Sequence, residues 1–427
     1  MMEKAMNRLI AHIIFQTKTA LKVGSNNNDF LQDSPIQRDW NELPMILGTS
    51  LAGILRKNFA QEIADDIFGK DFGSKIIFSN ALILDENHKV CESLCLEKSE
   101  FLQNFIVLPI REHTAITHKG VSKEHSKYDE EVVHKGARFK FRIEMLCEKE
   151  KDKESFFQTL DLLSDESLRI GSGSTKGRGE IEVLEITYGE YNINSKDYEN
   201  LTSSLNESLP QTYTAKTQEN PNYTLYKLTL KPDDFFIFGS GGGDDDADNI
   251  GVRENIIDYD KKELIKNKLL IPASSIKGAL SHRTTFYYNK LCGNFIENSQ
   301  ENKVEYVKEI FGAKKDKDKE ATKGKIILSD LYKDSIKDNQ KTFAHVKIDS
   351  FTSGAVNGAL FQEKTDTLNQ PFTLKIWLQK GIQDKAQEAF ELALKDIAKG
   401  FLPLGAATNK GHGIFIGNIT KDGVELC

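Results

Sequence analysis

The stretch Leu269-Leu-Ile-Pro-Ala-Ser-Ser-Ile-Lys-Gly-Ala-Leu-Ser-His-Arg283 decides the fold. Its apolar start is typical of a buried strand end, its proline stops that strand, and the two serines can cap a helix. With Ser274 or Ser275 as the cap, the first free backbone N–H groups of the helix lie close to Lys277. Such a helix start suits a phosphate.

The same arrangement occurs earlier, at Met45-Ile-Leu-Gly-Thr-Ser-Leu-Ala-Gly-Ile-Leu-Arg-Lys57. A repeated helix start of this kind indicates a duplicated module that contacts a polyanion twice. Two ordinary capped core helices are the alternative interpretation.

Composition narrows the protein class. A length of 427 residues favours two domains, and a net charge of −7 argues against a generic, charge-driven nucleic-acid binder. Five cysteines give no disulfide framework at this length, which favours a reducing, cytoplasmic setting. The sequence shows neither an apolar run long enough for a membrane span nor a secretion signal, so we expect no membrane partner.

Working outward from the two helix starts, further landmarks recur in the same order. Each half begins with a strand, at 9–18 and at 223–230. A polar loop, a strand with Lys-Ile-Ile, a central excursion and a late glycine-rich turn follow in both halves. The first helix is expected to carry its apolar face from the first helix start to Gly69, with the positions Leu51, Ile54, Leu55, Phe59, Ile63 and Ile67.

This order predicts internal duplication, because chance matches would not keep sequence order. The polar segment 194–222 is the linker candidate. We therefore predict a first domain at 1–193 and a second at 223–427.

The landmarks resemble the RAMP superfamily of CRISPR proteins, and within it the Cas seven-type backbone subunit of type III effector complexes. The residues that carry the resemblance are Gln32-Asp-Ser-Pro-Ile-Gln-Arg-Asp39, Pro272-Ala-Ser-Ser-Ile-Lys-Gly-Ala-Leu280, Thr175-Lys-Gly-Arg-Gly179 and Asn409-Lys-Gly-His-Gly413. The resemblance covers nearly the whole chain twice, so the chain looks like two such subunits fused in tandem, as in type III-D-like systems.

The resemblance implies an α+β fold of two RRM-like (ferredoxin-like) domains, each with a β-hairpin thumb. It implies subunits that stack along a CRISPR guide RNA and hold its backbone, among other effector subunits. The thumb would displace a guide–target base pair at regular intervals. An aspartate in the early loop would then support cleavage of the complementary target RNA, making the protein an endoribonuclease.

Asp33 is the first candidate for catalysis. RNA carries its own nucleophile, the 2′-OH, and a nearby carboxylate can take its proton or hold a metal ion such as Mg²⁺ or Mn²⁺. The second loop lacks Asp-Ser-Pro. Matching Asp260 to Asp39 places Glu254 opposite Asp33, and the other candidates in this loop are Asp244, Asp245, Asp246 and Asp248. A turn-capping role for Asp33 and a solvated aspartate loop are the alternatives.

Guide contacts are expected from both helix starts and both glycine-rich turns, where backbone N–H groups can approach a sugar-phosphate chain closely. Ala52 stands where the second copy has Lys277, so the first site is expected either to be weaker or to use Arg56 instead. The predicted contacts are Ser50, Arg56, Lys57, Lys176, Arg178, Ser274, Ser275, Lys277, Arg283, Lys410 and His412.

The excursion 111–135 is the predicted first thumb, and it carries His113, His118, His125 and His134. The second thumb, at 345–362, has a histidine only at its base, His345, which argues against a histidine mechanism shared by both. Phe351 or Leu360 could wedge between bases; an apolar hairpin core is the alternative.

His88, Cys91 and Cys95 have partial zinc spacing, with His113 or His118 as a fourth ligand, but the second half has no counterpart and zinc is not favoured. Competing functions are a guide-RNA scaffold that does not cut, for which Asp33 is dispensable, and a guide-processing endoribonuclease of the same superfamily. The latter usually relies on a histidine that neither early loop has. A metal-dependent enzyme built on the aspartate loop is the alternative outside the superfamily.

Overall fold

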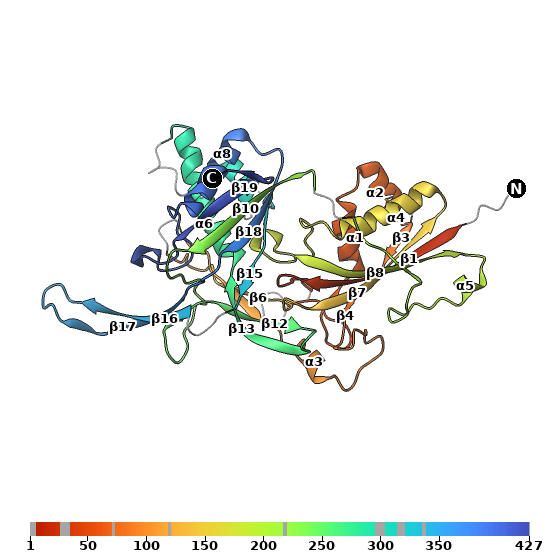
Figure 1. Cartoon of the computed structure of the whole chain (residues 1–427), viewed down its shortest axis with the longest axis horizontal. Helices are drawn as coiled ribbons and strands as arrows, with labels where there is room; N and C mark the ends of the chain where they lie inside the picture. The colour runs from red at the N-terminus through yellow and green to blue at the C-terminus, as the bar shows by residue number, and fades with distance from the viewer. Residues whose placement is uncertain are drawn as a thin grey trace.

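The structure, a computed structural model, describes residues 6–25, 35–70, 73–117, 121–216, 220–294, 304–313, 321–334 and 339–426. Two antiparallel sheets, each partly covered by helices, lie next to one another (Figure 1). The α+β class with two similarly built domains is therefore confirmed. Among the described residues, every helix is too short or too polar to cross a bilayer.

The first sheet is built around the first strand of the chain. This strand pairs on its two sides with the third and the fourth of the four strands that form the framework of the sheet. The chain order of the strands across this sheet is second, third, first, fourth, which is the ferredoxin-like order. Reading across the sheet, these strands are β3 (Ile76–Phe78), β7 (Arg138–Cys147), β1 (Asn7–Thr17) and β8 (Ile181–Asn192).

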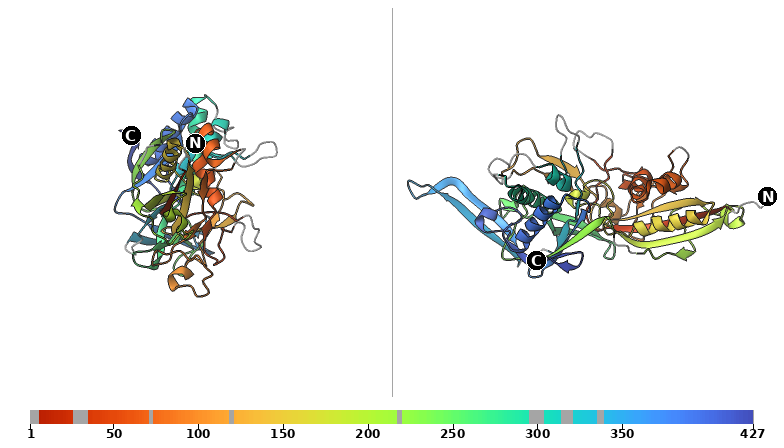
Figure 2. Two further views of the ribbon diagram at one scale, coloured as in Figure 1. Left: turned by 90° about the vertical axis from the view of Figure 1, so that its right-hand side faces the viewer. Right: turned by 90° about the horizontal axis from the view of Figure 1, so that it is seen from above.

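Alternation of residue types produces the buried face of this sheet. Along β7 the apolar side chains of Phe139, Phe141, Ile143 and Met145 are fully buried, and charged residues separate them on the opposite face. Successive side chains of a strand point to opposite sides, so one face joins the core and the other meets solvent. Helices α1 (Gly48–Arg56), α2 (Gln61–Phe68) and α4 (Glu150–Leu162) lie along the sheet (Figures 1 and 2).

The second sheet repeats this plan with its own core. Its strands in the same spatial order are β14 (Ile326–Leu328), β18 (Phe372–Gln379), β10 (Tyr223–Pro232) and β19 (Phe415–Lys421), with β20 (Val424–Glu425) at the edge. Its helices are α6 (Ala273–Leu291), α7 (Glu305–Phe311) and α8 (Asp384–Ala398).

Shorter elements connect these frameworks and form the thumbs. The long hairpin of β16 (Gln340–Ile348) and β17 (Ala355–Asp366) projects away from the body at the end far from the N-terminus (Figures 1 and 2). The first domain has a shorter hairpin, β5 (Ile110–His113) with β6 (Tyr128–Glu131). The remaining elements are β2 (Met45–Ile46), β4 (Ala81–Ile83), α3 (Glu100–Gln103), η1 (Ser174–Lys176), α5 (Lys196–Glu199), β9 (Gln211–Thr212), β11 (Asn249–Ile250), β12 (Arg253–Asp258), β13 (Glu263–Ile271), β15 (Leu331–Lys333) and η4 (Thr408–Lys410).

The predicted first helix is in fact two helices, so this expectation was wrong. α1 ends at Arg56, the chain turns, and α2 begins at Gln61. The side chain of Asn58 donates to the carbonyl oxygen of Ile54 (3.1 Å), a bond that competes with helix continuation. Phe59 is still buried, because apolar residues spaced four apart face the core on both sides of the turn.

The predicted serine caps were also wrong. Helix α6 begins right after Pro272, and Ser274 and Ser275 lie inside its first turn. The cap comes from elsewhere: Asp330 accepts from the backbone N–H of Ala273 (2.9 Å). In the first domain Asn80 accepts from the N–H of Gly48 in the same way (2.9 Å). The repeated strands 75–80 and 325–330 therefore explain the repeated helix starts.

The segment predicted as linker, 194–222, packs on the first domain over its described part. Strand β9 pairs with β8, and Leu205 is buried in the first core. The second half also contributes to this core, because Ile257 and Tyr259 are buried in it. The hydroxyl of Tyr259 donates to the carbonyl oxygen of Leu84 (2.7 Å).

Candidate RNA interface and carboxylate loops

The loop that carries Asp33 has a well-defined stem. Asp33 itself lies outside the described residues, but the backbone N–H of Ser25 donates to the carbonyl oxygen of Pro35 (3.1 Å), and Gly24 bridges Ile36. Glu131 of β6 accepts from the N–H of Ile36 (2.9 Å). The base of the loop is thus attached to the returning strand of the first thumb.

The aspartate loop of the second domain has the same stem. The backbone N–H of Ser240 donates to the carbonyl oxygen of Ile250 (2.9 Å), and Gly239 forms an isolated antiparallel β-bridge with Gly251. Both loops therefore span the same number of residues between equivalent bonds. Matched without a gap, Gly24, Ser25, Asp29, Asp33, Arg38 and Asp39 correspond to Gly239, Ser240, Asp244, Asp248, Arg253 and Glu254.

This register corrects the sequence alignment. Glu254 corresponds to Asp39, and Asp248 is the counterpart of Asp33. The two loops have the same length in the sequence, but matching Asp260 to Asp39 places the second loop out of register with the first. The stem hydrogen bonds show which residues are equivalent at the two ends of each loop. The match of Asp248 with Asp33, which lies outside the described residues, follows from the equal length of the loops.

Glu254 is buried in an ionic cluster between the domains. Arg111 of β5 donates to both of its carboxylate oxygens and also to Asp330 (2.6 Å), and the Tyr332 hydroxyl donates to Glu254 (2.8 Å). Burial raises the pKa of Glu254, but Arg111 and Tyr332 outweigh it and hold the pKa below the ordinary value. This carboxylate holds the domains together, which argues against its predicted catalytic role. No sequence motif identified Arg111 as a member of this cluster.

The aspartate loop faces solvent, apart from buried Ala247. Lys364 of β17 is paired with Asp244 (2.6 Å) and with Asp246 (3.0 Å), so its single positive charge is shared between these two carboxylates. Asp248 accepts from the backbone N–H of Gln362 (2.8 Å). Among the described residues, no three His, Cys, Asp or Glu side chains gather as metal ligands.

The glycine-rich turn of the first domain docks on the helix start of the second. The N–H of Asp330 donates to the carbonyl oxygen of Gly177 (3.0 Å), and Lys277 donates to the hydroxyl of Thr175 (2.9 Å). Predicted RNA contacts from two halves of the chain, Lys176 and the first turn of α6, are thereby brought together.

Two predicted contacts in these turns are buried, which contradicts a direct contact with RNA. Arg178 is 1% exposed and pairs with Glu130, while His412 is 8% exposed and packs on the Phe343 ring. Each lies two residues past an exposed or half-buried lysine, with a glycine in the left-handed region between them.

The remaining predicted contacts divide between partnered and open positions. Arg56 is paired with Asp65 (2.5 Å), and Arg283 with Asp396 (3.0 Å), at positions that support helix packing. Lys57 and Ser275 are exposed, and Ser50 and Ser274 are partly exposed.

The second thumb exposes apolar side chains. Phe351 at its tip is 96% exposed and Leu360 is 62% exposed, so neither forms an apolar hairpin core. In the first thumb His118 lies outside the described residues. His134 is buried near the domain contact, where its Nδ1 lies 3.1 Å from the carbonyl oxygen of Asn255.

Among the residues with partial zinc spacing, where zinc was not favoured, His88 lies at the contact between the domains. The His88 ring stacks on Tyr259 at 5.9 Å between centroids. Burial raises the pKa of Cys91 to about 11, and Cys95 adds to this effect.

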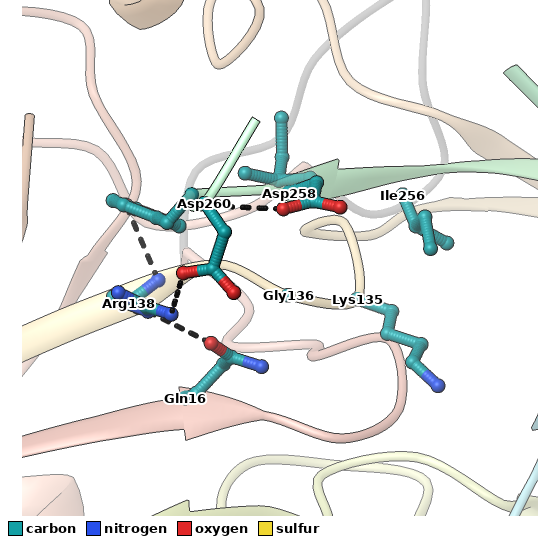
Figure 3. A pocket seen from close by; sticks show the side chains of 9 residues that line it. Gln16, Lys135, Gly136, Arg138, Ile256, Asp258 and Asp260 are labelled. Atoms are coloured by element: carbon teal, nitrogen blue, oxygen red, sulfur yellow. Dashed lines mark hydrogen bonds and ion pairs between the residues drawn. The ribbon is translucent and has the colours of Figure 1, made fainter. Parts of the chain in front are cut away.

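A pocket of about 230 Å³ opens between the domains (Figure 3). Arg138 donates to Gln16 (2.8 Å) and is paired with Asp260 (3.6 Å) at its rim, and Lys135 points into the same region. None of the predicted catalytic or RNA-contacting residues lines it.

Comparisons with known proteins give one family. The sequence profile of the RAMP superfamily matches residues 14–182 and again residues 235–416. No curated protein matches significantly. Among solved structures, a chain in "Cryo-EM structure of the Type III-B Cmr-beta bound to cognate target RNA" is similar at 17% identity and a TM-score of 0.33. The similarity covers 43% of this chain and 61% of that chain, less than two thirds of its length.

Proposed function

The chain belongs to the RAMP superfamily, and from this premise we propose that it is a guide-RNA-binding backbone subunit of a type III CRISPR effector complex that cuts complementary target RNA. The predicted tandem arrangement is confirmed by the double family match. The two carboxylate loops, with Asp33 in the first domain and Asp248 in the second, are the proposed sites of cutting. The equivalence of their stems is the observation that carries the proposal.

The residues where the glycine-rich turn of the first domain docks on the start of α6 support RNA binding between the domains. In the first turn of α6 the side chain of Ser275 is exposed and that of Ser274 is partly exposed. Lys176 reaches the same region from the glycine-rich turn of the first domain. Donors of this kind fit the phosphates of a single RNA strand, and they require no uniformly basic surface.

The reaction assigned to each loop is attack of a ribose 2′-OH on the adjacent phosphate. A loop carboxylate can accept the 2′-OH proton once the nucleotide is splayed into in-line geometry. The exposed apolar tip of the second thumb suits that displacement, because an apolar side chain can insert between unstacked bases. Lys364 is paired with Asp244 and Asp246, which leaves Asp248 as the carboxylate of this loop that we propose for proton transfer.

The co-purifying RNA tests the assignment directly. Purified from a host that carries a CRISPR array, the protein is expected to retain repeat-derived guide RNA, which sequencing identifies. Recovery of only random host fragments, at the level bound by an unrelated acidic protein, would contradict a guide-binding function.

A further inference from the structure

The bases of the two thumbs share a cross-strand pair that the sequence did not reveal. His113 lies opposite Tyr128, and His345 lies opposite Phe361. The rings are stacked in both, at 5.0 Å and 24° in the first thumb and at 6.5 Å and 27° in the second. The histidines therefore occupy equivalent positions, contrary to the sequence-based argument against a shared histidine.

A carboxylate follows the aromatic residue two positions later in both thumbs and contacts the imidazole. His113 Nε2 lies 3.2 Å from Glu130, and His345 Nε2 lies 3.0 Å from Glu363. The side chains of Glu130 and Glu363 are 15% and 5% exposed. Residues two apart share a face of a strand, so the spacing fixes this contact.

A lysine from the glycine-rich turn completes each set. Lys176 lies 3.7 Å from Glu130 and 5.1 Å from the Tyr128 ring centre. Lys410 lies 3.0 Å from Glu363 and 5.2 Å from the Phe361 ring centre. We call each set of histidine, aromatic residue, glutamate and lysine a thumb-base quartet.

The surroundings differ, which makes the repeated quartet informative. One hairpin has short strands and the other projects far from the body, and their remaining sequences differ. A contact that only fixes the turn needs no exposed groups. The side chain of His345 is 35% exposed and that of His113 is 15% exposed, while Lys176 and Lys410 are 35% and 36% exposed.

Each quartet adjoins a carboxylate loop. Glu363 is the register partner of Asn249 in β11, one residue after Asp248, and the neighbouring Gln362 donates to Asp248. In the first thumb Glu131, next to Glu130, accepts from the loop stem at Ile36. One strand therefore carries the quartet and positions the loop.

We propose that each thumb-base quartet is the acid half of an RNA-cleaving site, with the histidine as proton donor and the lysine stabilising the phosphate. This inference rests on the proposed function and adds a second proton-transfer group to it. The glutamate positions the imidazole, as a carboxylate behind a histidine does in other hydrolytic sites.

The reaction balances without a further reactant. The loop carboxylate accepts the proton of the 2′-OH, the bond between that oxygen and phosphorus forms, and the bond from phosphorus to the 5′-oxygen breaks. The imidazolium gives its proton to the departing 5′-oxygen. The products are a 2′,3′-cyclic phosphate and a 5′-hydroxyl, and the lysine offsets charge on the non-bridging oxygens.

Charged and titratable groups surround both imidazoles, and in the first thumb the Arg178 guanidinium lies 3.1 Å from the Nε2 of His113. His113 faces Glu130 and Tyr128 on β6, and Arg178 and Lys176 on the turn. Burial raises the pKa of Glu130, but His113 and Arg178 outweigh it and lower the pKa well below the ordinary value. His345 faces Glu363 and Phe361 on β17, with Lys410 from the turn, so a glutamate carboxyl group lies beside the ring in each thumb.

The test uses full-length protein with guide and complementary target RNA, and it scores each cut separately. His345→Gln is expected to slow the cut that Asp248→Ala removes by at least about 100-fold, a typical share for a general acid. His113→Gln is expected to act on the cut that Asp33→Ala removes. The matched control is His125→Gln, an exposed histidine of the first thumb outside the quartet.

The pH profile separates catalysis from structure. In Glu363→Gln, the pH at which the rate of the second cut falls through loss of the imidazolium proton is expected to shift to lower pH. Guide affinity is expected to stay within about twofold. An unchanged rate and pH profile in His345→Gln would overturn the proposal. So would equal loss of guide binding and of both cuts, which would make the quartet a structural link.

The outcomes also separate this inference from the proposed function. If the aspartate variants abolish cutting and the histidine variants do not, only the quartet proposal fails. If the wild-type protein binds guide RNA and cuts no target, both the cutting function and the quartet proposal fail.

Discussion

At the scale of single residues, Arg111 is central to the contact between the domains. Its guanidinium lies between the buried carboxylates of Glu254 and Asp330. Removing it leaves two uncompensated buried charges, which costs about 3–5 kcal/mol. We predict that Arg111→Met lowers the free energy of unfolding by about that amount in urea titrations.

The matched control is Arg56→Met, whose pair with Asp65 is 35% and 22% exposed. Partly exposed pairs contribute about 1 kcal/mol or less. Equal losses in the two variants would contradict the role given to Arg111.

His12 predicts a pH dependence of stability. Burial lowers its pKa from 6.5 to about 4, helped by the nearby Lys140 and Arg142. The fold favours the neutral ring, so its contribution is present above the unfolded pKa and is lost as pH falls from 6.5 towards 4. His12→Gln should flatten the decline of unfolding free energy across this window. An identical decline in wild type and variant would rule His12 out as a cause.

At the scale of elements, the two glycine-rich turns form a natural matched pair. Gly177 has φ +100°, and a Cβ there would lie 2.3 Å from Asp330 and 2.5 Å from Ala273. Gly411 has φ +91°, and a Cβ there would meet nothing within 4 Å.

We predict that Gly177→Ala destabilises the protein by at least about 2 kcal/mol more than Gly411→Ala. Both pay the left-handed backbone cost of roughly 1–2 kcal/mol, but only the first adds steric overlap. Thermal unfolding of the two variants measures the difference. Similar melting temperatures would show that the turn can shift to accommodate a Cβ at position 177, which would contradict the prediction.

The order of elements could be predicted from the sequence, because duplication preserved the landmarks in both halves. The residues at which the helices begin and end could not be predicted. The caps of α1 and α6 come from Asn80 and Asp330, which are distant in sequence and reach the helix starts only after the strands pair. The break at Asn58 was hidden, because apolar spacing continues across it.

The candidate site shows the same division. The loops, turns and lysines were recognisable as residue types. Burial of Arg178 and Glu254 depends on the packing of two domains, which no local pattern encodes. The equivalence of His113 and His345 became visible only when cross-strand register placed each beside an aromatic ring.

At the scale of the whole molecule, residues of the second half pack into the core of the first domain. Tyr259, from the second half, is 3% exposed within the first core, and its hydroxyl is bonded to Leu84. Tyr259→Ala should cost about 3–5 kcal/mol, as for other large aromatic truncations. Hydrogen exchange should then accelerate in β4 and β7 of the first domain. Exchange that increases only in the second domain would show that the cores are independent.

The central claim is that one chain carries two equivalent cutting sites, set by Asp33 and Asp248. The most direct measurement is a denaturing-gel map of target fragments for wild type, Asp33→Ala, Asp248→Ala and the double variant, at equal guide occupancy. The account predicts that each single variant loses a different cut and that the double variant loses both. Fragments identical to wild type in the double variant would contradict it and would identify the protein as a scaffold that binds RNA without cutting it.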